Sequence, residues 1–344
     1  HAQETRDAVN ARAMAVPAAL LLLTSLIAPF PAAAERALDL SQPQVVEFIA
    51  RMETKHYIRP DETRAVLGSA AVQPQILEAM RRPAEKVKPW HEYRQIFVTD
   101  KRIDAGVAFW AEQAETLDRV YAETGVPPEI VVGIIGVETY YGRITGNYRV
   151  VDALATLAFE YPPRSSFFTS ELEQFLLLTR EQDIDPLLAT GSYAGAMGGP
   201  QFISSSYRAY AVDGSGDGKV DLWNSWEDII SSVANYFTEH GWRRDGPVVT
   251  AAQPPVPAGS LSARLKLDRT VGGLREAGLE FGEADADEEV MLFELEGAQG
   301  PEYWVGFKNF YVITRYNRSN MYALAVHDLG QAIGDRRAEA AGGP

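Results

Sequence analysis

Apolar residues recur at helical spacing through most of residues 41–242, which predicts a mainly helical chain. Residues 127–242 keep this spacing except in one Gly/Asp-rich loop. Ser41 stands where a helix cap is expected, and Gly125 stands where a helix should end. Before residue 126 the helical spacing is carried by SQPQVVEFIARMETKH (41–56), PQILEAM (74–80) and RIDAGVAFWAEQAETLDRVYAETG (102–125).

The pattern changes after residue 250. Residues 251–260 (AAQPPVPAGS) are rich in proline and interrupt the helical spacing. Short apolar runs follow in residues 261–307, among them EEVMLFELEG and EYWVGF, and they predict strands of a small sheet. Residues 309–334 return to helix. The sequence therefore predicts an α+β protein that is mostly helical.

Charge and cysteine content remove several function classes. The net charge of −15 in 344 residues repels polyanions, so nucleic acid is not expected as a partner. The absence of cysteine excludes disulfides, thiolate nucleophiles and Cys-ligated zinc.

The N-terminal segment resembles an export signal. Arg12 precedes an apolar run of about 15 residues, which is shorter than a membrane span of ~20 residues. Small residues at 32–34 suit cleavage before Glu35, and Met14 is a candidate start. The alternative is a membrane anchor that is retained. We expect an exported, periplasmic protein that is not a lipoprotein, because no cysteine is available for acylation.

One glutamate lies within an apolar helical run. In PPEIVVGIIGVETYYG (127–142), helical spacing places Glu138 on the same face as Ile134, Ile135 and Tyr141. Such a carboxyl group is desolvated, which raises its pKa and suits a general acid. The alternative is a buried structural glutamate that pairs with Arg143 or Arg164, and the helix alone leaves both open.

Longer motifs resemble the membrane-bound lytic murein transglycosylase B family over about residues 45–335. The segments that carry the resemblance are GVPPEIVVGIIGVETYYG, GSYAGAMGGPQFISSSY, AVDGSGDGKVDLW, SVANYFTEHGW and FYVITRYN. The resemblance implies a lysozyme-like helical core with a helical lobe and a small β lobe. It also implies cleavage of the β-1,4 bond between N-acetylmuramic acid and N-acetylglucosamine in peptidoglycan, giving 1,6-anhydromuramic ends.

The predicted organisation combines the pattern with this resemblance. We expect a signal peptide (1–34), an N-terminal helical lobe (35–125), a lysozyme-like catalytic core (126–250), a small β lobe (251–307), a C-terminal helical part that returns to the core (308–335) and a tail (336–344).

The resemblance assigns site residues by position. Glu138 matches the catalytic acid and base of the family, and an intramolecular attack needs only one carboxylate. Small residues in YAGAMGGP would let the backbone approach a sugar, or they form a tight turn. Tyrosines would offer ring faces and hydroxyls, although core packing is the alternative for each. The implied substrate-binding residues are Tyr93, Arg164, Ser192, Gln201, Tyr236, Tyr316, Asn317 and Tyr322. Pro163 stands beside Arg164 where the family often has a second arginine.

A loop from residue 213 suggests calcium. Asp213, Ser215 and Asp217 occupy positions 1, 3 and 5 of an EF-hand-like loop, and the Lys219 carbonyl would occupy position 7. Position 12 is an asparagine instead of the usual glutamate, and the acids Glu227 and Asp228 come later. The resemblance implies a lengthened loop that binds one structural Ca²⁺ with Asp228 as distal ligand. The alternative is a metal-free Gly/Asp turn.

Two rival functions stay open. A muramidase would use water and release reducing ends, whereas a non-catalytic module would bind the cell wall or calcium. The single loop and 6 methionines speak against a calcium sensor. We expect a monomer that acts on glycan strands, with cell-wall remodelling proteins as further partners.

Overall fold

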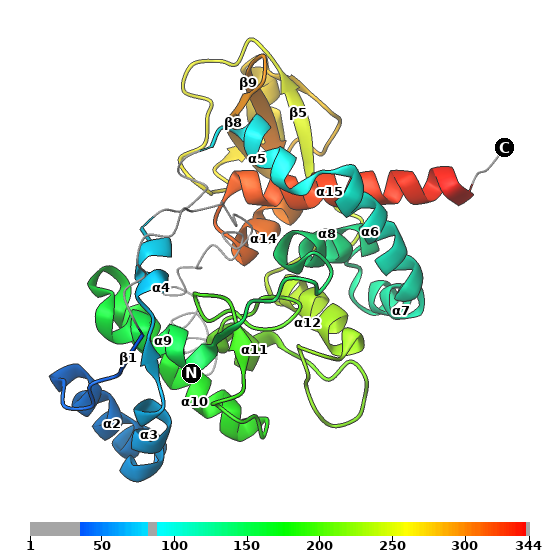
Figure 1. The fold of residues 1–344 in the computed structure, drawn as a ribbon. Coiled ribbons are helices and arrows are strands. Elements are labelled where there is room, and N and C mark those ends of the chain that lie inside the picture. Colours follow the sequence, from blue (N-terminus) through cyan, green and yellow to red (C-terminus); the bar gives the residue numbers. More distant parts are fainter. Residues whose placement is uncertain (1–34, 82–87, 342–344) are drawn as a thin grey trace.

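The computed structural model describes residues 35–81 and 88–341, and the predicted signal peptide lies outside them (Figure 1). The elements before residue 82 are β1 (Arg36–Ala37), α2 (Pro43–His56), α3 (Pro60–Gly68), β2 (Ala71–Val72) and α4 (Pro74–Ala79). All three helices begin with proline, which has the helical φ and needs no N–H partner there. The predicted Ser41 cap is wrong: Gln42 is the cap residue, and the Ser41 hydroxyl bonds Asp39 instead.

The next helices lie against the core. The run predicted over 102–125 is two helices that are separated at Gln113, and Gly125 ends the second with φ 73° as predicted. These helices are α5 (Trp90–Phe97), α6 (Asp100–Glu112) and α7 (Ala114–Thr124). Because α5 and α6 pack on α15 (Asn320–Ala341) and α7 packs on α12 (Trp226–Glu239), residues 35–125 are not one packing unit. The change of packing partner falls between α4 and α5.

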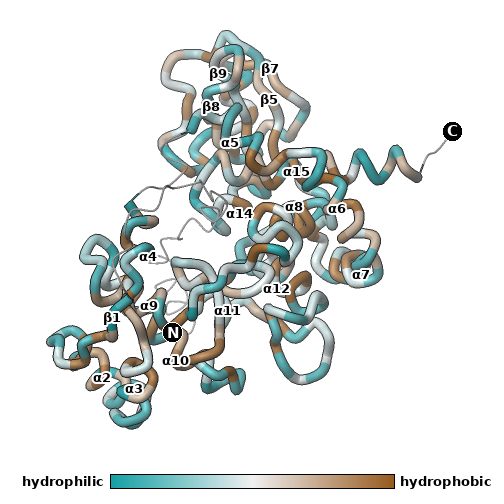
Figure 2. Tube along the Cα trace, in the orientation of Figure 1, coloured by the Kyte–Doolittle hydropathy of each residue, from teal (hydrophilic) through white to brown (hydrophobic). Residues whose placement is uncertain are grey.

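A helical core occupies the centre of the molecule. Figure 2 shows apolar residues concentrated on α8 and its neighbours, and polar residues on the outer turns. The remaining core elements are α8 (Pro128–Thr139), β3 (Tyr148–Arg149), α9 (Val150–Glu160), η3 (Pro162–Arg164), α10 (Ser165–Glu181), β4 (Thr190–Gly191), α11 (Ser204–Tyr210) and α14 (Lys308–Tyr316).

Two glycines bring α8 and α15 together. A Cβ on Gly133 would lie 2.6 Å from the Val326 carbonyl oxygen, and a Cβ on Gly330 would lie 2.3 Å from the Glu129 carbonyl oxygen. No larger residue fits at either position while the backbones stay this close. This approach places the N-terminal turns of α15 beside the C-terminal turns of α8.

The small sheet forms a separate lobe with its own apolar cluster. Its antiparallel strands follow the order β6-β8-β9-β5-β7, and β8 and β9 coincide with two predicted strands. The helix α13 within this lobe was not predicted. The lobe consists of β5 (Val249–Gln253), β6 (Arg269–Thr270), α13 (Val271–Glu276), β7 (Glu280–Phe281), β8 (Glu289–Gly297) and β9 (Gly300–Gly306).

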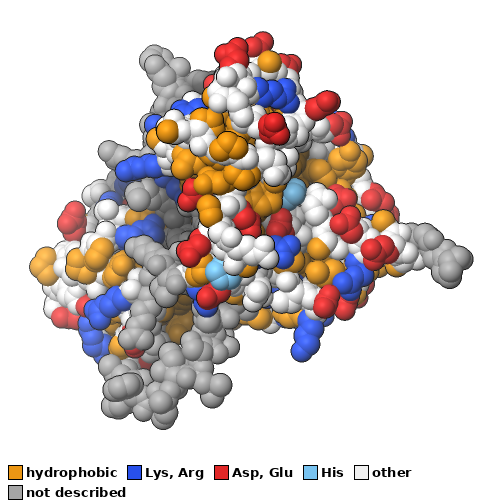
Figure 3. All heavy atoms as spheres, turned by 90° about the horizontal axis from the view of Figure 1, so that it is seen from above, with side chains coloured by type: hydrophobic (Ala, Val, Ile, Leu, Met, Phe, Trp, Pro, Cys, Tyr) orange, Lys and Arg blue, Asp and Glu red, His pale blue; other side chains and the backbone are white. Residues whose placement is uncertain are grey.

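Acidic residues outnumber basic residues on this β lobe. Residues 249–307 hold eleven acidic and four basic residues. Figure 3, which views the molecule from the side of the β lobe, shows acidic side chains at the edge of that lobe. The predicted α+β, mostly helical architecture is confirmed.

Candidate active site

Glu138 lies in the last turn of α8 and is 1% exposed. Ile134 and Ile135 are buried with it, as the helical spacing predicts. The prediction that the helix continues to residue 142 is wrong, because α8 ends at Thr139 and the chain turns into the left-handed region. Tyr141 therefore does not share the Glu138 face.

A tyrosine from α15 contacts the buried carboxyl group. The Tyr322 hydroxyl donates a hydrogen bond to Glu138 Oε1, and Tyr322 is completely buried. Burial is the largest cause that raises the pKa of Tyr322 well above its ordinary value, and the charge of Glu138 is the second. The same two causes raise the pKa of Tyr316. With pKa values raised in this way, both hydroxyls stay protonated near neutral pH and can donate hydrogen bonds.

The other predicted tyrosines surround this pair. Tyr316 donates to the Pro200 carbonyl at 2.6 Å, and its ring lies 4.8 Å from that of Tyr236, centroid to centroid. Tyr236 in turn donates to the Arg315 carbonyl at 2.7 Å. Tyr93 is close enough to Tyr322 to influence its pKa.

The ring faces of these tyrosines are covered. Their exposed fractions range from 0% to 8%, and the lowest two belong to Tyr322 and Tyr93. This burial favours the packing role that was the alternative for each, and contact of their rings with sugars stays a prediction. Their hydroxyls hold carbonyl and carboxyl oxygens in place.

The glycine-rich segment brings Gln201 beside this cluster. Gln201 follows Pro200 directly, has φ 52°, and donates from Nε2 to the Thr145 and Gly198 carbonyls at 3.0 and 2.9 Å. Its Oε1 is buried and accepts no hydrogen bond from the described residues. A buried acceptor without a donor is costly, which marks this oxygen as a candidate ligand contact.

The small residues of this segment serve the fold itself. A Cβ on Gly198 would lie 2.0 Å from the Leu222 carbonyl oxygen, and one on Gly191 would lie 2.2 Å from the Ala196 carbonyl oxygen. Ser192 Oγ accepts hydrogen bonds from two backbone N–H groups inside the turn, at 3.0 and 3.3 Å. These contacts fit the tight turn that was the alternative, and approach of this backbone to a sugar stays a prediction.

Arg164 and Asn317 lie on other elements. Arg164 ends η3, and its guanidinium lies 4.4 Å from the Phe167 ring centroid; burial lowers its pKa. Asn317 follows α14 and is 2% exposed. Its backbone carbonyl accepts the Ser319 N–H at 2.8 Å. The structure brings together Glu138 and the tyrosines, with Gln201 next to them.

Two residues that connect these elements were not predicted from the sequence. Thr139 follows Glu138, is fully buried, and donates to the Gly199 carbonyl at 3.0 Å, which ties α8 to the glycine-rich segment. Arg102 on α6 donates to the Gly136 carbonyl at 2.9 Å. A polar residue beside Glu138 in an apolar run was a signal for Thr139; nothing local in the sequence indicates Arg102.

The loop after residue 213 folds around Asp213. Its Oδ1 accepts the Ser215 hydroxyl at 3.1 Å and the Gly216 N–H at 2.6 Å, and its Oδ2 accepts the Gly218 N–H at 2.7 Å. These hydrogen bonds lower the pKa of Asp213, and the one from the Gly218 N–H has the largest effect. The Asp217 carboxylate is exposed and accepts the Lys219 N–H at 2.9 Å.

Asp228, the predicted distal calcium ligand, is buried against the loop backbone. It is 1% exposed; its Oδ1 accepts the Gly214 and Ser215 N–H groups at 2.9 and 3.0 Å, and its Oδ2 accepts the Asp221 N–H at 2.8 Å. Oδ1 is saturated and only Oδ2 retains a lone pair, so the residue clamps the loop backbone. In residues 35–81 and 88–341 no three His, Asp or Glu side chains converge as a metal site. The donors that fit calcium are two carboxylates, a hydroxyl and a carbonyl at positions 1, 5, 3 and 7.

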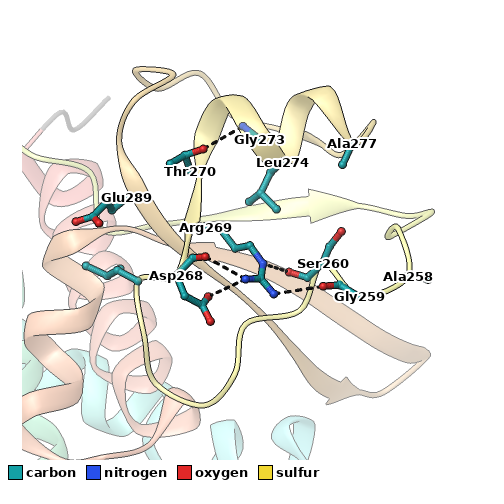
Figure 4. Close-up of a pocket in the computed structure, with 11 residues that line it drawn as sticks. Ala258, Gly259, Ser260, Asp268, Arg269, Thr270, Gly273, Leu274, Ala277 and Glu289 are labelled. Atoms are coloured by element: carbon teal, nitrogen blue, oxygen red, sulfur yellow. Dashed lines mark hydrogen bonds and ion pairs between the residues drawn. The ribbon is translucent and has the colours of Figure 1, made fainter.

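The β lobe holds a pocket of its own, of about 510 Å³ (Figure 4). Arg269 points into it, donates to the Ser260 and Leu261 carbonyls, and forms an ion pair with Asp268. Its charge is therefore used to fix the loop above the sheet.

Among the described helices, no single one is long and apolar enough to cross a membrane. The bent pair of α7 and α8 reaches the required length and apolar composition only when the two helices are taken together.

Fold and site together define a mostly helical α+β protein that is built around a buried carboxyl group. The chain belongs to the transglycosylase SLT domain family, whose model matches residues 41–331. It is 43% identical over 303 residues to the membrane-bound lytic murein transglycosylase B of Escherichia coli K12, covering 85% of this chain and 83% of that protein.

Solved structures agree with this assignment. The soluble lytic transglycosylase SltB1 of Pseudomonas aeruginosa is 49% identical with a TM-score of 0.82, over 86% of this chain and all of that one. Escherichia coli Slt35 in complex with calcium is 41% identical with a TM-score of 0.80, over 89% and 97% of the two chains. These likenesses confirm the predicted α+β class with a lysozyme-like core.

Proposed function

We propose that this protein is a lytic transglycosylase that cleaves the β-1,4 bond between N-acetylmuramic acid and N-acetylglucosamine in peptidoglycan. Family membership supports the activity. The observation that carries the assignment of Glu138 is its burial on an apolar helix with the Tyr322 hydroxyl on Oε1. Burial disfavours the charged form of a carboxyl group, which is the condition a general acid needs.

The proposed reaction uses one carboxyl group twice. Protonated Glu138 first gives its proton to the glycosidic oxygen, and the bond from C1 to that oxygen breaks. The carboxylate then takes the proton of the substrate's own C6 hydroxyl as that oxygen attacks C1. The product carries a 1,6-anhydromuramic end, no water is consumed, and Glu138 ends protonated.

The nearest acids downstream are engaged elsewhere, which supports a single-carboxylate mechanism. Asp152 is 4% exposed and accepts two hydrogen bonds from Arg149 and one from the Ala71 N–H. Glu160 forms an ion pair with Arg36 at 2.7 Å. Because both carboxylates already have these partners, we propose that Glu138 acts without a second carboxylate of the kind a hydrolase uses.

Groups near Glu138 are proposed to bind the glycan strand. Gln201 Oε1 needs a donor, and a sugar hydroxyl or acetamido N–H would supply one. Asn317 and Arg164 remain proposed contacts to acetamido and anionic groups, and Ser192 to sugar hydroxyls. Tyr236, Tyr316, Tyr322 and Tyr93 are proposed to act by holding the surrounding backbone and the acid.

The test is Glu138→Gln, which keeps the shape but cannot give a proton. We expect release of anhydro-muropeptides to fall at least about a hundredfold, with unchanged melting temperature. The wild-type rate should also decline as pH rises and Glu138 loses its proton. Mass spectrometry of digested peptidoglycan checks the product: reducing ends would mean a muramidase, and an active glutamine variant would remove Glu138 from the mechanism.

A calcium site in the loop is part of the proposal. Asp213, Ser215, Asp217 and the Lys219 carbonyl would hold Ca²⁺ with a structural role, and Asp228 would add only its free Oδ2 lone pair. The similarity to Slt35, solved with calcium, supports this. Leu222, at the end of the loop, accepts the Gly199 N–H at 2.8 Å, so an ordered loop would steady the segment that carries Gln201.

Location and partners are proposed from the sequence. We infer export to the periplasm by a cleaved signal peptide, a monomeric state, and cell-wall remodelling proteins as partners. Fractionation with N-terminal sequencing of the mature protein tests the export.

A further inference from the structure

The chain turns sharply directly after Glu138. Tyr140, Tyr141 and Gly142 have φ values of 51°, 58° and 79°. Glycine adopts this region without strain, but two consecutive tyrosines do so only where their surroundings hold them. The position of Glu138 therefore depends on whatever holds this turn.

The N-terminal end of α6 holds both tyrosines. The Tyr141 hydroxyl donates to the Arg102 carbonyl at 2.9 Å, and the Tyr140 hydroxyl donates to the Lys101 carbonyl at 3.3 Å. The Tyr141 hydroxyl fills a space that two glycines leave open, since a Cβ on Gly106 or Gly136 would lie 2.5 or 2.7 Å from it. Helix α6 thus fixes the turn from one side.

The Arg102 side chain reaches the end of α8 itself. It is 6% exposed, and its Nη1 donates to the Gly136 carbonyl at 2.9 Å. Its guanidinium lies 4.7 Å from the Tyr140 ring centroid and 5.4 Å from that of Phe97. No carboxylate among the described residues forms an ion pair with it. A buried cation without a counter-ion is costly, and here the negative end of a helix dipole and two ring faces compensate.

We propose that Arg102 is a positioning residue for Glu138, which it holds in place through the last turn of α8. This inference rests on the proposed function, because Arg102 acts through the proposed acid. The Gly136 carbonyl also accepts the Tyr140 N–H, at 3.2 Å, so it joins the helix, the turn and Arg102. Without the guanidinium, the strained turn can relax and move Glu138 away from Tyr322. A displacement of about 1 Å can cost on the order of a hundredfold in rate.

The experiment is steady-state kinetics on solubilised peptidoglycan strands. Arg102→Met, which keeps the length but loses the charge and donors, should lower kcat by about 10- to 100-fold and leave KM within about twofold. Arg102→Lys keeps a charged donor for the Gly136 carbonyl and should recover part of kcat. Arg143→Met is the matched control, because exposed Arg143 also stacks on Tyr140, at 4.8 Å; its kcat should equal that of the wild type.

A second substitution tests the strain. Tyr140→Gly removes the cost of the left-handed conformation, so Arg102→Met should reduce kcat less in the Tyr140→Gly background than in the wild type. A residue that binds substrate directly would show the same reduction in both backgrounds. If Arg102→Met does not fold, Arg102→Lys takes its place: it keeps the charge but loses the planar guanidinium, and should lower kcat a few-fold at constant KM.

Several results would overturn the inference. A folded Arg102→Met protein with wild-type kcat, or one in which only KM rises, removes the positioning role. Where Arg102→Met does not fold, wild-type kcat in Arg102→Lys removes it as well. An inactive Glu138→Gln beside a fully active Arg102→Met defeats this inference alone, whereas a fully active Glu138→Gln defeats the proposed acid and this inference with it.

Discussion

Replacing Asp228 with asparagine tests whether this residue clamps the calcium-loop backbone independently of any metal. Its carboxylate accepts three backbone N–H groups, from Gly214, Ser215 and Asp221. Asparagine keeps the shape, and its single oxygen can still accept the first two. Its NH₂ group would then face the Asp221 N–H, so a hydrogen bond becomes a contact between two donors.

The expected loss of stability follows from these bonds. A hydrogen bond to a charged group contributes about 1.5–3 kcal/mol, and a part-buried N–H left without an acceptor adds further cost. Asp228 is 1% exposed, so water cannot easily replace the carboxylate. We expect Asp228→Asn to lower the free energy of unfolding by about 3 kcal/mol. At roughly 2 °C per kcal/mol for a protein of this size, the melting temperature should fall by about 6 °C.

Calorimetry after thorough chelation, repeated with added calcium, separates the two roles. A backbone clamp lowers the melting temperature in both conditions, whereas a residue that acts only as a metal ligand lowers it only when calcium is present. The control is Asp217→Asn, because Asp217 is exposed and its one bond, to the Lys219 N–H, survives the change. If Asp228→Asn and the wild type have the same melting temperature in chelator, Asp228 does not clamp the loop backbone.

Two further predictions concern metal and pH. Added Ca²⁺ at a hundredfold excess over Kd should stabilise the wild type by about 2.7 kcal/mol, Mg²⁺ should do so much less, and Asp217→Ala should lose the shift; equal melting temperatures with and without Ca²⁺ would leave an ordinary turn. Burial raises the pKa of Glu173, but hydrogen bonds from Lys55 and His56, at 2.6 and 2.8 Å, outweigh it and leave that pKa lowered. A lowered folded-state pKa stabilises the fold above the unfolded value of about 4.3, and this stability is lost as pH falls through the folded pKa. Glu173→Gln should therefore cost stability in urea unfolding at pH 7 and progressively less toward about pH 3, and a constant difference would contradict this linkage.

Local pattern predicted the elements better than their ends. The strands β8 and β9 and the helix that carries Glu138 follow from apolar spacing within a few residues. The end of that helix does not, because Tyr140 and Tyr141 lack the glycine that usually marks a left-handed cap. Their conformation is fixed by Lys101 and Arg102, which lie 39 residues earlier in the chain. Such a long-range contact overrides the conformational preference of the residues in the turn, and the sequence around the turn does not reveal it.

The partner of Glu138 was likewise beyond local reasoning. Helical spacing shows that the carboxyl group faces apolar side chains, but Tyr322 lies 184 residues later. The two meet because Gly133 and Gly330 let α8 and α15 approach at backbone distance. The resemblance assigned Tyr322 to the site by position, without showing what it does there.

The burial of the tyrosines changes how the site would recognise a sugar. Sequence reasoning gave their rings two uses, as core and as platforms for substrate, and the 0–8% exposure favours the core. Their hydroxyls are spent on Glu138, Pro200 and Arg315, so they fix the acid and the backbone beside it. Gln201 Oε1 is a buried acceptor without a donor among the described residues, so it is our proposed specific contact to a glycan strand. Selectivity in such a site comes from the positions of a few fixed acceptors and donors, because a wrong substrate leaves them buried and unpaired.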